Sequence, residues 1–186
     1  MSGTPERVNV LFVCLGNICE SITDILWILL TLTGRSTMAE GVFRSVAKDN
    51  ARVGEIDSCG TGAYHTLDPP DYRTMATLKK NKIDDYDHGA RQVTKEDFND
   101  FDYIFAMDAS NLRDLEKLKR RVESKGQKSR AQVMLFGEFS GKSKAEQVED
   151  PYYGRDNGFD VVFEQVKRFS SNFLKSLDEE SVASNS

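Results

Sequence analysis

Short apolar runs along the chain predict four β-strands. The segment Val8–Val13 is almost continuously apolar, which is typical of a central parallel strand buried on both faces. Three later runs, Glu55–Ser58, Tyr103–Met107 and Gln132–Phe136, also have the length of strands. Segments with helical spacing separate the runs, so the strands are expected to pair in parallel.

Apolar residues three and four positions apart predict helices between these strands. Met38, Val42 and Phe43 mark the first of them. Thr94 followed by Asp97 indicates a capping box, with Asp in place of the commoner Glu or Gln. The predicted helices are Thr37–Lys48, Asp71–Lys82, Thr94–Phe101, Ser110–Arg121 and Phe159–Leu177.

The alternation of strands and helices predicts one α/β domain with three layers, in which helices cover both faces of a four-stranded parallel sheet. Ligands bind beyond the carboxyl ends of the strands in such sheets, where the loop beginning at Cys14 is expected. The domain is assigned to residues 1–180, and the polar residues 181–186 are expected to form a disordered tail.

Composition and charge narrow the class of protein. The 186 residues are 39% hydrophobic and 30% charged, with a net charge of −5, which disfavours a nucleic-acid binder. The N-terminus lacks the basic start and apolar run of a signal peptide, and Ile25–Leu32 is too short to span a membrane. Three cysteines without disulfide-scaffold spacing favour a reducing, cytoplasmic location.

The motif VCLGNIC, from Val13 to Cys19, combines a thiol with a turn at the end of the first predicted strand. Backbone amides and a helix dipole at such a turn favour the thiolate of Cys14 and also suit a phosphate dianion. Thiol-based phosphoryl transfer needs both features. An isolated cysteine is more often a buried core thiol, so the motif is not decisive alone.

Two further segments carry polar groups that are weak evidence individually. Asp150, close to Tyr152 and Tyr153, could protonate a leaving phenolate, although Asp-Pro is also a common turn initiator. His88 lies in the segment HGARQ, and a lone histidine is more often structural than catalytic.

Together these segments resemble the low-molecular-weight protein tyrosine phosphatases. The shared landmarks span Val8 to about Leu177 and stand in the family's order: VCLGNIC, PPDYR, HGARQ, TKEDF, FDYIFAMD, SNLRDL and EDPYYG. The resemblance implies hydrolysis of phosphotyrosine proteins or small aryl phosphates without a metal or cofactor. It leaves the oligomeric state open, and neither nucleic acid nor a membrane is an expected partner.

The resemblance also implies roles for individual residues. Cys14 would be the nucleophile that forms a phosphocysteine, and Asp150 the acid that protonates the leaving group and then the base that activates water. Arg35 would bind the phosphate oxygens through its guanidinium fork. The implied substrate-binding residues are Asn17, Ser36, Ser58, Tyr64, His88, Tyr152 and Tyr153, and Cys19 is the implied redox partner of Cys14.

The chain departs from the family at this loop. The family pattern C-x5-R-S would place arginine after Cys19, but Glu20 stands there, and RSTMAEG resumes only at Arg35 after a 15-residue insertion, Glu20–Gly34. In one geometry the insertion loops out and Arg35 returns beside Cys19. In the other, an extended helix carries Arg35 away. Either geometry is expected to disturb the amides that hold phosphate, and Glu20 would repel the dianion.

Three functions are compatible with these residues. The first is a tyrosine phosphatase that the insertion impairs. The second is a binding protein that retains the fold without turnover. The third is an arsenate reductase of the same fold, which would need further redox cysteines; Cys59 is the only spare thiol, and the paired tyrosines after Asp150 favour the phosphatase.

The insertion has the form of a retained intron. Cys19-Glu20-Ser21 can be encoded with the donor sequence GTGAGT, and Thr33-Gly34 with an AG acceptor. Splicing between them removes fifteen codons in frame and restores CLGNIC-RSTMAEG. We hypothesise that residues 20–34 are encoded by such an intron. Genomic sequencing across this region should find GTGAGT at codons 19 to 21, and its absence would end the hypothesis.

Overall fold

Four parallel strands form one sheet in the order β2-β1-β3-β4. A computed structural model describes residues 7–15, 34–62, 69–151 and 157–184. The strands are β1 (Val8–Cys14), β2 (Val53–Gly60), β3 (Tyr103–Ala106) and β4 (Gln132–Leu135). This confirms the predicted four-stranded parallel sheet, with β1 as an inner strand whose residues 10–13 are fully buried.

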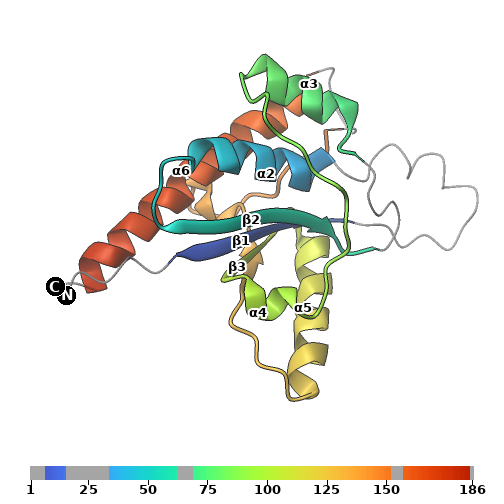
Figure 1. Cartoon of the computed structure of the whole chain (residues 1–186), viewed down its shortest axis with the longest axis vertical. Coiled ribbons are helices and arrows are strands. Elements are labelled where there is room, and N and C mark those ends of the chain that lie inside the picture. Colours follow the sequence, from blue (N-terminus) through green and yellow to red (C-terminus); the bar gives the residue numbers. More distant parts are fainter. Residues whose placement is uncertain (1–6, 16–33, 63–68, 152–156, 185–186) are drawn as a thin grey trace, which may run out of the picture.

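Helices cover both faces of the sheet (Figure 1). On one face lie α2 (Gly34–Val46), α3 (Tyr72–Lys80) and the long α6 (Gly158–Ser184). The other face carries the short α4 (Asp97–Asp100) and α5 (Ala109–Ser124). A 3₁₀ turn, η1 (Glu138–Ser140), follows β4. No helix of the described residues is long and apolar enough to cross a membrane.

The alternation of side chains along β1 divides the core between the two faces. Val10 and Phe12 point into the core beneath α2 and α6, while Leu11 and Val13 face α4 and α5. The larger core is rich in phenyl rings: Phe105 packs 5.0 Å from the rings of both Phe136 and Phe173. The central strand is therefore fixed from both sides, and its carboxyl end is a rigid platform.

Local sequence signals explain where several elements begin. The Asp71 carboxylate accepts the Arg73 N–H at the start of α3, and the Asp108 carboxylate accepts the Asn111 N–H at the start of α5. Both aspartates thus satisfy amides that lack a partner inside the helix.

Two boundaries differ from the sequence predictions. The helix predicted over Thr94–Phe101 is only α4, although the Asp97 carboxylate does accept the Thr94 N–H at 2.7 Å, which is one half of a capping box. The prediction that residues 181–186 are disordered is wrong for residues 181–184, because α6 continues to Ser184. The three residues after Leu177, where the apolar pattern ends, continue α6 although they are exposed.

Candidate active site

The thiol of Cys14 lies beside the hydroxyl of Ser36. Cys14 is the buried last residue of β1, and Ser36 belongs to the first turn of α2. Their Sγ and Oγ atoms are 3.1 Å apart. The segment after the insertion has therefore returned to the nucleophile candidate. This contact contradicts the geometry that carries the segment after the insertion away from Cys14, while Cys19 and residues 20–33 lie outside the described residues.

The Arg35 side chain is held at the carboxyl edge of the sheet by two acceptors. Its Nη1 donates to Asp108 Oδ2 at 2.8 Å and to the Val148 carbonyl at 3.3 Å. Only 12% of the side chain is exposed. Both of these contacts use Nη1, and the guanidinium carries further donors on Nε and Nη2, the type of fork that binds an oxyanion.

Asn111 is a site residue that the sequence reasoning missed. Its fully buried amide, in the orientation that satisfies both ends, donates to Asp108 Oδ2 at 3.3 Å and accepts the Leu15 N–H at 3.2 Å. Leu15 directly follows Cys14, so Asn111 connects the aspartate that holds Arg35 to the first turn of the phosphate loop. The motif SNLRDL marked this asparagine as a landmark, but nothing in one sequence indicated its contact with Leu15.

A fully buried carboxylate, Glu40 on α2, is the second missed residue. Its Oε2 accepts the hydroxyls of Ser58 at 2.7 Å and Tyr86 at 2.8 Å, and lies 3.1 Å from His88 Nδ1. Its Oε1 is paired with Arg44 at 2.7 Å. Glu40 thus brings together Ser58 and His88, which the family resemblance had implicated, and ties both to α2.

The charge state of this cluster follows from its partners. Burial by itself raises the pKa of Glu40, but the hydrogen bond and charge of His88, the Ser58 hydroxyl and the charge of Arg44 together hold that pKa below its ordinary value. Burial, followed by the adjacent Glu40 charge, raises the pKa of Tyr86, so its hydroxyl stays a donor. The cluster is therefore an ionised carboxylate enclosed by donors.

The same cluster has enough ligand atoms for a metal ion. Glu40, Asp57 and His88 each offer an atom within 4.8 Å of the others. However, Asp57 is already bound to Arg91 Nε at 2.7 Å, and Glu40 accepts from three groups through one oxygen. The carboxylates of Glu40 and Asp57 are paired with the guanidinium groups of Arg44 and Arg91, which favours a hydrogen-bond network over a metal site.

The segment leading to Asp150 is fixed at the same edge as Arg35. The Val148 N–H donates to the Met107 carbonyl at 2.8 Å, and the Val148 carbonyl accepts from Arg35. Asp150, half-buried, is two residues further on. Asp150, the predicted acid, therefore follows a segment that is held at the carboxyl edge of the sheet, where Cys14 and Arg35 also lie.

Gln165 on α6 anchors the residue before Asp150. Its Oε1 accepts the Glu149 N–H at 3.0 Å, and its Nε2 lies 3.4 Å from the Gln147 carbonyl. Gly158 is needed where the loop rejoins α6, because a Cβ there would overlap the Pro151 carbonyl. Gln165 is a third residue that sequence reasoning missed, because it reads only as one polar position on an amphipathic helix.

Five of the predicted site residues lie outside the described residues. For these positions the structure gives no geometry, so their roles stay predictions. They are Asn17, Cys19, Tyr64, Tyr152 and Tyr153.

The comparisons with known proteins agree on one family. The sequence profile of the low molecular weight phosphotyrosine protein phosphatases matches residues 24–183. The chain belongs to this family. The matched stretch begins inside the insertion, downstream of Cys14.

Individual relatives match most of the chain. The low molecular weight phosphotyrosine protein phosphatase of Schizosaccharomyces pombe is 47% identical over 175 residues, which cover 92% of this chain and 98% of that protein. The Homo sapiens protein of the same name is 40% identical over 169 residues, covering 90% and 94%. The chain is accordingly a phosphatase of this family, a hydrolase of phosphate monoesters.

Solved structures with the same fold include two phosphatases of different stated specificity. A protein tyrosine phosphatase from Entamoeba histolytica, with Hepes in its active site, superimposes with a TM-score of 0.67 at 32% identity and covers 94% of this chain and 99% of its own. The Drosophila arginine phosphatase gives 0.74 at 31% identity, with coverage of 91% and 97%.

The buried Glu40 network predicts a specific pH dependence of stability. Because the pKa of Glu40 is lower in the folded state, its contribution is present above the unfolded pKa of about 4.3 and is lost as pH falls through the folded value. Glu40→Gln should reduce the free energy of unfolding by roughly 3 kcal/mol at pH 7. Urea unfolding followed by circular dichroism should show the difference narrowing below about pH 4.3. Glu123→Gln, exposed on α5, is the control and should change little; a pH-independent loss in Glu40→Gln would contradict the network's ionised state.

Proposed function

We propose that the chain hydrolyses phosphotyrosine and aryl phosphates through a covalent phosphocysteine on Cys14. The observation that carries the proposal is the 3.1 Å contact of Cys14 Sγ with Ser36 Oγ. It joins the two parts of the family loop, cysteine and arginine-serine, across the insertion. The Ser36 hydroxyl is a donor that would stabilise the thiolate both as nucleophile and as leaving group.

The first step transfers the phosphoryl group to sulfur. The Cys14 thiolate attacks phosphorus, the bond from phosphorus to the aryl oxygen breaks, and the Asp150 carboxyl group donates its proton to the departing oxygen. Arg35, oriented by Asp108, binds two of the non-bridging oxygens as charge develops.

The second step returns the enzyme to its starting state. The Asp150 carboxylate removes a proton from water, whose oxygen attacks the phosphocysteine phosphorus. The bond from sulfur to phosphorus breaks, so the Cys14 thiolate and inorganic phosphate are released, and Asp150 is protonated for the next turnover. Further parts of the proposal are a reversible Cys14–Cys19 disulfide, an aromatic rim formed by Tyr64, Tyr152 and Tyr153, and a cytoplasmic location.

Cys59 weighs against a reductase function. It lies on β2 opposite Val13 but belongs to the core under α5, whereas Cys14 belongs to the core under α2. Burial raises the pKa of Cys59, which keeps it as an unreactive thiol. A non-catalytic binding protein is the remaining alternative, and turnover measurements distinguish it from a phosphatase.

The insertion is expected to suppress turnover. Glu20 stands where the C-x5-R spacing has arginine, and residues 19 and 35 are no longer bonded neighbours in the loop that aims amides at phosphate. Purified full-length protein should hydrolyse phenyl phosphate at least about a hundredfold more slowly than a variant lacking Glu20–Gly34. Cys14→Ser should abolish the activity of the shortened form. Full-length turnover within tenfold of the shortened form, abolished by Arg35→Ala, would show instead that the loop tolerates the insertion.

The role of Asp150 predicts a dependence on the leaving group. In the variant lacking Glu20–Gly34, Asp150→Asn should slow hydrolysis most for aryl phosphates whose phenols have a high pKa, because these need protonation to depart. The measurement is kcat across a series of substituted phenyl phosphates. Glu149→Gln is the matched control: it removes the charge next to Asp150 and should leave the dependence of kcat on the leaving group unchanged. Equal slowing across the series would argue against Asp150 as the acid.

A further inference from the structure

A groove beside Cys14 is not used by the proposed chemistry. It has a volume of about 380 Å³ and lies between α5 and the residues that follow β2. Thr61 and Gln92 form one wall, and Asp114, Lys117, Leu118 and Arg121 on α5 form the other. The Thr61 N–H donates to the Cys14 carbonyl at 3.2 Å, so the groove begins next to the backbone of the nucleophile.

The wall opposite α5 is held in place by backbone hydrogen bonds. Gly60 at the end of β2 donates to the Arg91 carbonyl at 2.9 Å and accepts the Val93 N–H at 2.8 Å. The Gln92 amide donates to the Thr61 carbonyl at 3.1 Å. Val93 and the buried Leu115 give the groove an apolar lining.

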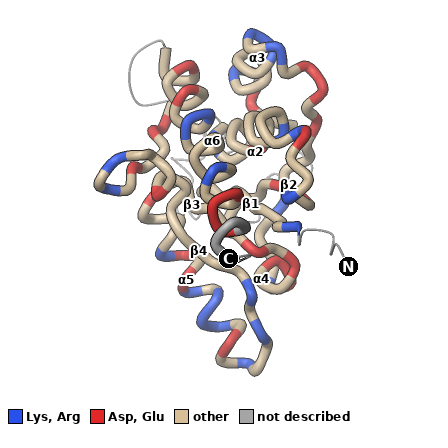
Figure 2. The backbone as a smooth tube through the Cα atoms, turned by 90° about the vertical axis from the view of Figure 1, so that its left-hand side faces the viewer, with Lys and Arg blue, Asp and Glu red and all other residues tan. Residues whose placement is uncertain are grey.

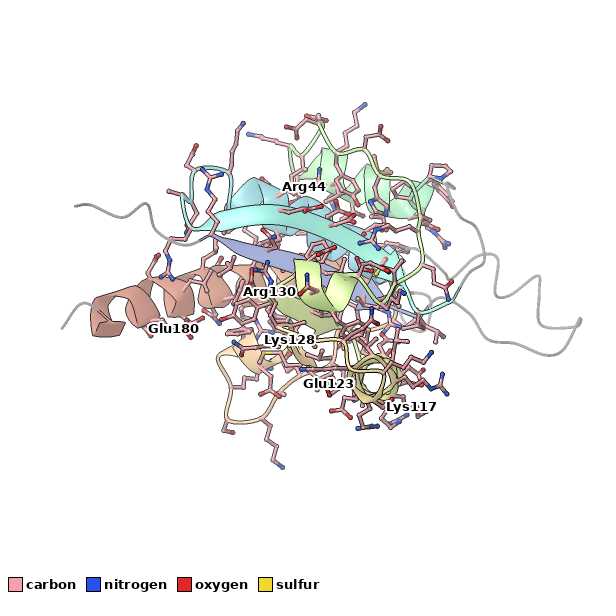
Figure 3. All side chains as sticks on the ribbon, turned by 60° about the horizontal axis from the view of Figure 1, so that its bottom comes forward. Arg44, Lys117, Glu123, Lys128, Arg130 and Glu180 are labelled. Carbon is pink, nitrogen blue, oxygen red and sulfur yellow. The ribbon has the colours of Figure 1, made fainter. Side chains whose placement is uncertain are left out.

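The α5 wall of the groove carries one more basic than acidic residue, because Lys117 and Arg121 outnumber Asp114, although the whole chain carries a net charge of −5. Lys117 and Arg121 are four residues apart and therefore share one face of the helix. Lys117 is bonded to Asp114 at 3.1 Å, and Arg121 has no ion pair among the described residues. Figure 2 shows the basic residues that follow one another along α5, and Figure 3 labels Lys117 on this helix near the carboxyl end of the sheet.

We infer that this groove binds acidic residues that flank the phosphotyrosine of a protein substrate. The inference rests on the proposed function, because it assumes that the phosphotyrosine reaches Cys14. An extended peptide advances about 3.3 Å per residue, so residues a few positions from the phosphotyrosine would reach Lys117 and Arg121. Carboxylates there would meet Lys117, which would share its charge with Asp114, and Arg121, which has no ion pair with any described residue; aliphatic side chains between them would contact Leu118.

The test measures peptide binding to the full chain, so it does not depend on turnover. Fluorescein-labelled peptides carry a non-hydrolysable phosphonate analogue of phosphotyrosine, flanked either by Asp and Glu or by Asn and Gln. Fluorescence anisotropy gives both dissociation constants. The acidic peptide should bind roughly tenfold more tightly, as expected for two exposed ion pairs, and salt should weaken the preference. In Lys117→Glu/Arg121→Glu the preference should be lost or reversed.

The matched control changes the same number of charges at basic residues that lie outside the groove lining. Arg120 and Lys125 are exposed and do not line the groove, so Arg120→Glu/Lys125→Glu should keep the preference. Circular dichroism checks the folding of both variants. Loss of the preference in both variants alike, or no preference in the unmodified chain, would overturn the inference. Binding of a single-stranded oligonucleotide that exceeds that of the acidic peptide, and is lost with Lys117 and Arg121, would assign the groove to nucleic acid and also overturn it.

A second pair of peptides separates this inference from the proposed function. These peptides carry unmodified tyrosine in place of the phosphonate. Equal affinity of the phosphonate and tyrosine peptides would show that the phosphate site fails in the full chain. The preference for acidic flanking residues can still be measured with the tyrosine peptides. Failure of the phosphate site and failure of the groove would therefore give different results.

Discussion

The ion pair between Arg35 and Asp108 is the constraint on which the site depends. It joins the first turn of α2 to the end of β3 and the N-terminus of α5, and the same guanidinium reaches the Val148 carbonyl before Asp150. Asp108 also binds Asn111, which accepts the N–H of Leu15. One mostly buried pair therefore connects the loop of the proposed nucleophile, the arginine proposed to bind phosphate and the segment that carries the proposed acid.

The Arg35–Asp108 pair is formed in the chain that carries the insertion. A loop-closure cost that grows slowly with length allows a fifteen-residue segment to leave and rejoin the fold. The sheet and the helices on both faces are intact around it, because the core phenyl rings and the Glu40 network lie outside the interrupted loop. The phosphate nest is more demanding than the core, since its amides must converge on one point. Fold and catalysis can thus respond differently to the same insertion.

A buried carboxylate gives the opposite side of the site its rigidity. Glu40 accepts from Ser58 and Tyr86 and pairs with His88, so the end of β2 and the residues 86–88 are tied to α2. Removing any one donor leaves a buried charge with fewer partners, which is costly. The groove between Thr61 and α5 lies across the sheet from this network and is bounded by surface charges, which tolerate substitution more readily.

The sequence by itself determined the four parallel strands, most helix positions and the candidates Cys14, Arg35, Ser58, His88 and Asp150, because periodicity and ordered motifs are local properties. It did not determine where α6 ends or how short α4 is, because helix ends leave only weak signals in the apolar pattern. Only the tertiary structure revealed Glu40, Asn111 and Gln165, each of which has at least one partner 16 or more positions away along the chain. A single polar residue on an amphipathic helix looks alike whether it faces water or a buried hydrogen bond, and the fold decides which.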